Sequence, residues 1–208
     1  EDPNDSEGGI SWNARLGGVI LIKGAKSSDL STLLQIMSGA KAVQHKANIY
    51  APEFLYYMYV SEVPSLLEGS ILHNLLCAVS KRRRVREPTH EEAWRVAEMC
   101  GLSSEFIRSP DSFSVGKAGR NLSMSDRQSV CIARALLCDP DVLVMHYPTE
   151  LMERQKEVMV LQLFSDFVSK GGIWAILDGP QEAYRGHGDK GGKTPLDYVK
   201  GTGVRTVI

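Results

Sequence analysis

The sequence predicts an α/β fold on a mostly parallel sheet, because short apolar runs alternate along the chain with longer segments of helical character. Four runs have the length and composition of buried strands: residues 19–22, 56–60, 141–145 and 173–177. Residues 150–170 form an amphipathic pattern that stops at two glycines, and most of residues 64–140 are also helical in character. We therefore expect a parallel sheet interrupted in the chain by a helical insertion.

The ends of two expected helices carry recognisable signals. Thr89 and Glu92 have the spacing of a capping box, so a helix should begin after Thr89 and end at Gly101. Another helix is expected over residues 31–38, with two hydroxyl residues in its first turn.

Composition and charge exclude several functional classes. The chain has 208 residues, of which 43% are apolar and 24% charged, so it can bury a full core. Its net charge of −1 supplies no overall field that would attract nucleic acid or an anionic membrane. The basic run at residues 81–86 is interpreted as a solvated loop, with contact to anionic lipid or nucleic acid as the alternative. No apolar run reaches the roughly 20 residues needed to cross a bilayer, so we do not expect the chain to span a membrane.

Cysteine spacing predicts free thiols. The four cysteines, Cys77, Cys100, Cys131 and Cys138, include no C-x-x-C pair, and three of them lie in segments of helical character. Buried free thiols fit this pattern better than disulfides or metal ligands. They indicate a reducing intracellular compartment, either cytoplasmic or organellar.

Residues 24–32, GAKSSDLST, follow the first expected strand and precede the first expected helix. This is the setting of a phosphate-binding loop, G-x-x-x-x-G-K-[ST], whose backbone N–H groups cradle phosphate while the lysine neutralises its charge. Asp29 stands at the second glycine and Leu30 at the lysine, so a carboxylate is added and the cation is missing. The other two fixed positions, Gly24 and Ser31, keep their residue types, and Thr32 directly follows the motif. Ser31 alone is interpreted as an ordinary serine of the first helical turn.

A longer stretch points to a family. Residues 121–149 read NLSMSDRQSVCIARALLCDPDVLVMHYPT. They resemble the segment of ABC-transporter nucleotide-binding domains that runs from the LSGGQ signature to the Walker B strand. Residues 59–74 look like the Q-loop of exporter-type members, and residues 178–183 resemble the H-loop and the residues after it. Together with the phosphate-loop segment, the resemblance covers roughly residues 16–183.

The resemblance implies a three-layer, P-loop NTPase-like α/β core. This core would comprise residues 16–63 and 139–208, with an inserted α-helical signature subdomain over residues 64–138. Residues 1–15 would form a flexible, acidic N-terminal end, and the acidic start does not have the composition of a signal or transit peptide.

The catalytic motifs of the family are all altered in this sequence. The resemblance assigns these vestigial positions: Gly24, Asp29, Leu30, Ser31 and Thr32 in the phosphate loop, Glu62 in the Q-loop, Ser123 and Asp126 in the signature, His146 and Tyr147 after the Walker B strand, and Asp178 in the H-loop. Two unit charges ~4 Å apart interact by roughly 4 kcal/mol at an effective dielectric near 20, so the acidic residues among them would repel ATP. The resemblance therefore implies no hydrolysis, and binding of ATP and Mg²⁺ that is lost or very weak.

Four of these residues, Asp29, Glu62, His146 and Asp178, are expected to converge on one pocket. One histidine with three carboxylates could hold a divalent metal, for which His146, Asp29 and Asp178 are the candidate ligands. The alternative, which we favour, is that protonated His146 pairs with one carboxylate and acts as an internal staple.

Loss of the catalytic residues with retention of the core predicts a pseudo-ATPase that serves as a scaffold or interaction subunit. Its partner would be a protein or a transmembrane subunit docked near residues 60–80, in a larger assembly that could be membrane-bound. No nucleic-acid partner is expected. The altered signature and the altered D-loop at residues 150–153 argue against the ATP-sandwich dimer of the family. The alternatives are the inert half of an asymmetric ABC transporter and a metal-binding module.

Overall fold

The computed structural model describes residues 17–23, 27–42, 52, 54–79, 86–108, 113–179 and 206–207. The described helices are α1 (Ser27–Met37), α2 (Ile71–Leu76), α3 (His90–Met99), α4 (Ser104–Arg108), the 3₁₀ helix η1 (Lys117–Gly119), α5 (Met124–Leu137), α6 (Arg154–Lys170) and α7 (Ile173–Leu177). The strands are β1 (Tyr57–Val60), β2 (Val142–Met145) and β3 (Thr206–Val207). The expected acidic end at residues 1–15, Gly24 and most of the basic run lie outside the described residues.

The described strands form one small parallel sheet in the order β1-β2-β3. Tyr57 pairs with Val142 at one end of β1, and Val60 pairs with Met145 at the other. Every residue of β2 is buried, as expected for a parallel strand covered on both faces. The predicted strands at residues 56–60 and 141–145 and their parallel pairing are confirmed, whereas the described sheet is smaller than a full P-loop core.

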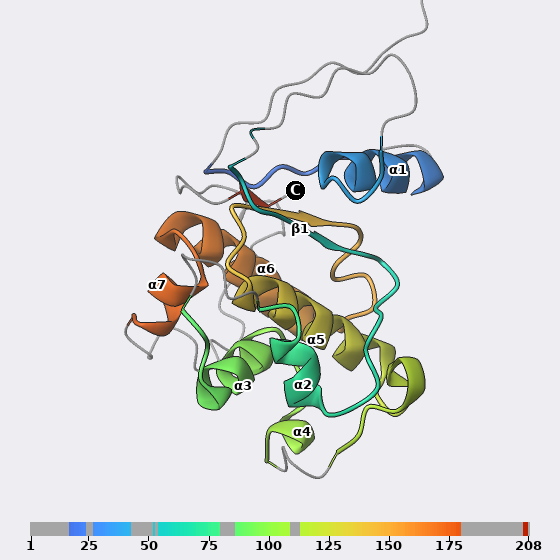
Figure 1. Ribbon diagram of the computed structural model, residues 1–208, viewed down its shortest axis with the longest axis vertical. Helices are drawn as coiled ribbons and strands as arrows, with labels where there is room; N and C mark the ends of the chain where they lie inside the picture. The colour runs from blue at the N-terminus through green and yellow to red at the C-terminus, as the bar shows by residue number, and fades with distance from the viewer. Residues whose placement is uncertain are drawn as a thin grey trace, which may run out of the picture.

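Helices cover both faces of β2, because its side chains alternate between them. On one face, Leu30 and Leu34 of α1 pack with Val142 and Val144. The larger core on the other face contains Leu143 together with the buried sides of α5 and α6. Figure 1 shows α1 on one side of the strands and α5 and α6 on the other.

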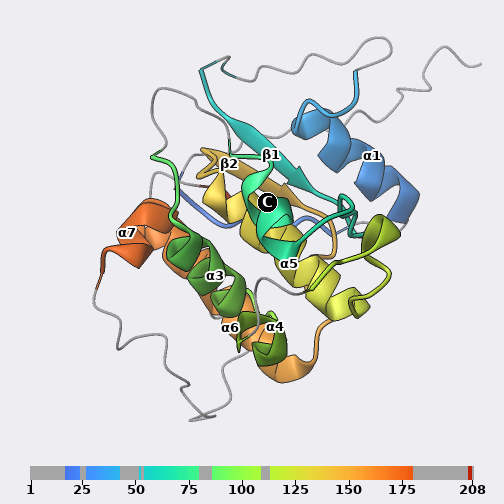
Figure 2. The ribbon, with the colours of Figure 1, turned by 60° about the horizontal axis from the view of Figure 1, so that its bottom comes forward.

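The helical region between β1 and β2 packs around α5. Helices α2 and α3 both pack against α5, and α3 also lies alongside α6 (Figure 2). The predicted capping box is confirmed, since the Thr89 side chain accepts from Glu92 N and the Glu92 side chain accepts from Thr89 N. Gly101 follows the end of α3 with φ +84°, a conformation that suits glycine. The division of the chain into core and signature subdomain stays a prediction.

The strand predicted at residues 173–177 is wrong, because this segment is helix α7. Five apolar residues are too few for periodicity to separate a strand from a helix. Ile173, Ile176 and Leu177 are buried while Ala175 is exposed, which is the spacing of a helix face. A contact distant in sequence starts the helix, since Ile173 N donates to Asp139 Oδ1 at 3.0 Å.

The buried strand predicted at residues 19–22 is also wrong. Val19 forms a single β-bridge, and Leu21 is 58% exposed. The second neighbour of β2 in the described sheet is β3, so the place beside β2 at Val142 and Leu143 is already taken. The helix expected over residues 31–38 begins four residues earlier, at Ser27.

Helix α6 ends as its glycines predict, although it begins at Arg154 rather than at residue 150. Gly171 has φ +84° and ψ +30°, and its N–H donates to Phe167 O. A Cβ at this position would meet no atom within 4 Å, so any cost of adding one comes from the backbone alone.

We predict that Gly171→Ala lowers the free energy of unfolding by about 1 kcal/mol, because the left-handed conformation disfavours a Cβ. Gly171→Asn should cost less, since asparagine tolerates this conformation. Urea denaturation measures both changes. Gly18→Ala is the matched control, because Gly18 has an equally open Cβ position and no positive φ. A loss at Gly18 as large as at Gly171 would contradict the explanation.

Candidate functional site

His146 and Glu62 lie close together beyond the carboxyl ends of β2 and β1. His146 N donates to Val60 O at 3.0 Å, which continues the parallel ladder by one residue. The His146 side chain is 1% exposed, and its Nδ1 lies 3.2 Å from Glu62 Oε2. That distance is within ion-pair range, but the orientation is not that of a hydrogen bond, and neither ring nitrogen has a hydrogen-bond partner in the part of the chain described. The geometry thus supports the expected pairing of His146 with a carboxylate.

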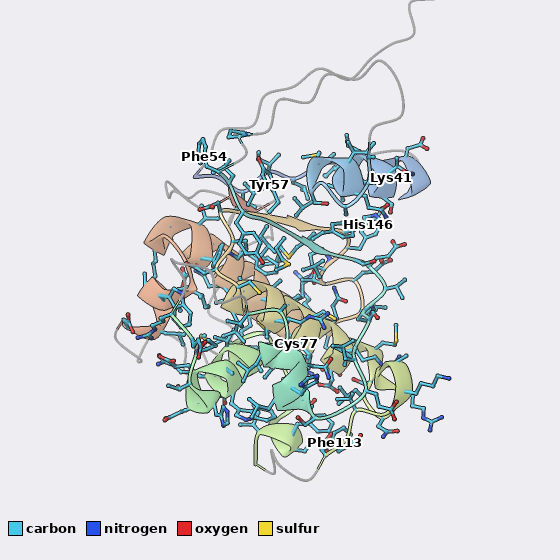
Figure 3. The ribbon with its side chains drawn as sticks, in the orientation of Figure 1. Lys41, Phe54, Tyr57, Cys77, Phe113 and His146 are labelled. Carbon is cyan, nitrogen blue, oxygen red and sulfur yellow. The ribbon has the colours of Figure 1, made fainter. Side chains whose placement is uncertain are left out.

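The predicted convergence of four residues on one metal-binding pocket is wrong. Within the described ranges, no group of three or more His, Cys, Asp or Glu side chains could hold a metal ion. Asp178 ends α7, which Figures 1 and 3 show on the opposite side of the molecule from the labelled His146. The reason is that residues 173–177 form a helix, so they do not carry Asp178 to the edge of the sheet.

The remnant of the phosphate loop has become part of α1. Asp29 lies in the first turn, where a carboxylate is favourable because of the helix dipole. Leu30 stands at the position of the phosphate-binding lysine, and its side chain is buried against the sheet. Ser31 is the fifth residue of the helix, so it lies after the first turn and not in it as expected. Its hydroxyl accepts a hydrogen bond from Gln35 Nε2 at 3.2 Å. Thr32 is half-buried on the same helix.

At the start of α5, the vestigial signature residues cap the helix. Ser123 is the N-cap residue, and its Oγ accepts from Asp126 N at 3.1 Å. The Asp126 carboxylate is buried and accepts from the Ser123 hydroxyl, from Ser103 N at 3.1 Å and from Ser103 Oγ at 2.7 Å. Lys156 Nζ lies 3.8 Å from the same carboxylate. A negative group of the chain itself therefore occupies this helix N-terminus.

The sequence contained part of this signal. Ser123 and Asp126 have the [ST]-x-x-[DE] spacing of a helix cap, which could have identified the capping role of Asp126. The contributions of Ser103 and Lys156 are not visible in the sequence, because they come from segments far from α5 in the chain.

Sequence reasoning missed a cluster around Arg86, which ties the start of α3 to the end of α7. The guanidinium contacts Glu92, lies 3.1 Å from Asp178 Oδ1 and lies 4.6 Å from the centroid of the Trp174 ring. The hydrogen bond from Thr89 N lowers the pKa of Glu92, and the Thr89 hydroxyl and the Arg86 charge act in the same direction. Asp178, the vestigial H-loop residue, therefore belongs to a surface ion-pair cluster.

A pocket of about 150 Å³ lies between β1, the segment after it and α5. Its lining residues are Met58, Tyr59, Val60, Ser61, Val63, Pro64, Ser65, Ala78, Cys131, Arg134 and Ala135. Val63 in this lining is 65% exposed, and Leu67, two residues after the lining residue Ser65, is 53% exposed. Arg134 Nη2 donates to Ser65 O at 3.0 Å and to Cys131 Sγ at 3.4 Å. We call this pocket and its rim the β1–α5 groove.

The four cysteines are free, and three of them are buried as expected. Burial raises the pKa of Cys131 and raises the pKa of Cys138 to about 11, so both thiols are neutral at pH 7. The expectation is wrong for Cys77, which is exposed just after α2.

Comparison with known proteins relates the chain to transporters. No family model matches it. It is 28% identical over 179 residues to the ABC-type transporter MDR1 of Aureobasidium melanogenum, covering 78% of this chain and 13% of that protein. It is 29% identical over 174 residues to the mitochondrial iron-sulfur clusters transporter ABCB7 of Homo sapiens, covering 77% and 22%. It is 32% identical over 114 residues to the ABC multidrug transporter MDR2 of Trichophyton equinum, covering 54% and 8%.

A solved structure of a bacterial Atm1-family ABC exporter with ATP bound is similar at a TM-score of 0.46 and 22% identity, over 53% of this chain and 19% of that one. The sequence relatives establish that this chain is related to ABC transporters. It spans between 8% and 22% of the length of the three relatives named above. In the described ranges, no helix has the length and apolar character needed to cross a bilayer.

We predict that Asp126→Ala lowers the free energy of unfolding by about 2–3 kcal/mol, because the variant loses the carboxylate at the N-terminus of α5 and leaves the Ser103 donors without their acceptor. Urea denaturation measures the change. Asp126→Asn keeps one acceptor oxygen and should lose less. Equal stability of the alanine variant and the unaltered protein would show that the carboxylate does not stabilise α5.

Proposed function

We propose that this chain is a pseudo-ATPase, a non-hydrolysing relative of ABC-transporter nucleotide-binding domains that serves as a scaffold or interaction subunit in a larger assembly. The observation that carries the proposal is the buried Asp126 carboxylate at the start of α5. The resemblance assigns this helix N-terminus to the γ-phosphate of a partner's ATP. Helix N-termini bind anions through free N–H groups and a positive dipole end. Here Asp126 supplies the anion, and its own N–H is bonded to Ser123 Oγ.

The other half of the composite nucleotide site supports the same proposal. A phosphate loop requires a strand that delivers it to the carboxyl edge of the sheet and a free loop before the helix. In the described chain, residues 19–22 form no strand, and β3 lies beside β2. Ser27 and Ser28 are already helical, which shortens the loop. Leu30, at the position of the lysine, is buried in the core.

The His146–Glu62 contact is a third support. The resemblance assigns His146 to the Walker B carboxylate, which holds the Mg²⁺ shell in the family, and Glu62 to the Q-loop glutamine. His146 Nδ1 lies 3.2 Å from Glu62 Oε2, so the two side chains are in direct contact beyond the ends of β1 and β2. We infer that this contact replaces the nucleotide-dependent link between the two segments.

We predict that Mg-ATP at low-millimolar concentration gives no binding heat in calorimetric titration, no shift in melting temperature and no phosphate release. The physical reason is that the chain offers carboxylates and a buried leucine where phosphate needs amides and a cation. The same titration of an active ABC nucleotide-binding domain is the positive control.

Micromolar binding of Mg-ATP without hydrolysis would contradict the pseudo-ATPase proposal. It would favour the second candidate, the inert nucleotide-binding half of an asymmetric ABC transporter. The relation to full-length transporters is the observation behind that candidate.

We further propose that the β1–α5 groove binds the partner. Its volume of about 150 Å³ suits one large apolar side chain, and the exposed Val63 in its lining offers apolar surface at the rim. Arg134 forms no ion pair with any described carboxylate, which favours an acidic residue on the partner. Because the relatives are membrane transporters, the proposed partner is a helix of a transmembrane subunit, which would hold this domain at a membrane surface.

We predict that a photo-crosslinking residue at Val63 forms adducts with a membrane protein through an apolar segment containing Asp or Glu. Ser65→Trp, which fills the mouth of the groove from an exposed position, and Arg134→Glu should each reduce adduct yield about 10-fold or more. Arg154→Glu makes the same charge change at an exposed position outside the groove and should leave the yield unchanged. Adducts that survive both groove variants would contradict the assignment.

A further inference from the structure

Arg86 joins two helices through one exposed side chain. Its guanidinium contacts Glu92 in the first turn of α3 and lies 3.1 Å from Asp178 at the end of α7. It also lies over the Trp174 ring of α7, 4.6 Å from the centroid. These three interactions depend on one charge, so a new anion near Arg86 would compete for all of them.

Thr89 follows Arg86 by three residues and carries an accessible hydroxyl. It is exposed, its backbone is extended at φ −68° and ψ 160°, and residues 86–89 belong to no helix or strand. The hydroxyl donates to Glu92 Oε2 at 3.1 Å in the capping box. The sequence before Arg86 is also basic, with Lys or Arg at each of residues 81–84.

We propose that Thr89 is a phosphorylation site for an arginine-directed serine/threonine protein kinase. Such kinases recognise substrates by charge pattern, with an acidic pocket for an arginine three residues before the acceptor hydroxyl. Arg86 has this spacing in a segment outside any helix, and its side chain is 48% exposed although it contacts Glu92 and Asp178, whereas the Glu92 side chain is 22% exposed. The acidic residues after Thr89 are less available to an acid-directed kinase, because Glu91 and Glu92 lie in the first turn of α3 and Glu92 is engaged in the capping box.

The phosphoryl group comes from the ATP that is bound to the kinase. Thr89 Oγ attacks the γ-phosphorus, a new O–P bond forms, and the bond from that phosphorus to the β–γ bridging oxygen breaks so that ADP leaves. The hydroxyl proton passes to the catalytic aspartate of the kinase. The product carries a charge of about −1.5 to −2 at pH 7.

The modification changes the partners of Arg86. A phosphate on Thr89 would face the Glu92 carboxylate, which now accepts from the Thr89 hydroxyl, and the like charges would separate. The same phosphate would bind Arg86 in a charge-assisted pair and draw it from Asp178 and Trp174. Helix α7 would then lose its tie to the start of α3 but keep the hydrogen bond from Arg95 Nη1 of α3 to Leu177 O at 3.1 Å, so the modification loosens α7 without releasing it.

The first test is incubation of the full chain with ATP and the catalytic subunit of cAMP-dependent protein kinase, followed by peptide mass spectrometry. We expect a mass gain of about 80 Da, one phosphoryl group, on Thr89. Thr89→Asn keeps an N-cap side chain but no acceptor hydroxyl, so this site should show no gain. No modification of Thr89 while a control peptide is phosphorylated would overturn the proposal.

Two variants separate recognition from loosening of α7. Arg86→Gln should slow phosphorylation about 10-fold or more, because the recognised cation is missing. Asp178→Asn removes the ion pair of this tie and leaves Arg86 and its contact with Trp174, and it should be phosphorylated at the rate of the unaltered chain. An undiminished rate for Arg86→Gln, or modification by an acid-directed kinase alone, would overturn the arginine-directed assignment.

Hydrogen exchange tests the consequence for α7. Phosphorylation should increase the exchange rate of the amides of residues 173–177 severalfold, and Asp178→Asn should increase it by less without phosphorylation, because the Trp174 contact remains. Unchanged exchange in fully phosphorylated protein would show that Arg86 keeps its contacts with α7.

Discussion

The burial of β2 on both faces is the constraint on which the rest of the structure depends. A parallel strand with no exposed residue is stable only if helices cover it from both sides. Helix α1 meets this need on one face with Leu30 and Leu34, and α5 and α6 meet it on the other. Because α5 is held against the sheet, it supports α2 and α3 in turn, and the segment between β1 and α2 then borders the β1–α5 groove.

Sequence patterns located the elements whose signals are local. The capping box of Thr89 and Glu92, the glycine end of α6 and the two central strands depend on residues a few positions apart, so they could be predicted. The two failed strand predictions depend on distant contacts. Residues 173–177 turn into a helix from a start held by Asp139, and residues 19–22 lie outside a described sheet in which β3 pairs with β2. The residues of a short apolar run do not indicate which distant segments will contact it.

The same division applies to the candidate site. The resemblance located Glu62, Asp126 and His146, and the structure brings Glu62 and His146 together. It could not reveal what each vestigial residue does in place of binding nucleotide. Asp126 accepts two hydrogen bonds from Ser103, 23 residues away, and Asp178 lies beside Arg86, 92 residues away in the chain. In both cases a carboxylate is held by polar or charged groups of the chain itself, so each carboxylate has a structural partner within the fold.

The pairing of α1 with β2 has a consequence for synthesis on the ribosome. More than a hundred residues separate Leu34 from Val142, and α1 is made first. Until β2 emerges, Leu30 and Leu34 lack Val142 and Val144, and at roughly 5–20 residues per second that interval lasts about 5–20 seconds. During this time the exposed apolar side of α1 is available to chaperones that bind such segments. The order of the elements along the chain thus leaves the apolar side of α1 incompletely covered until β2 has been made.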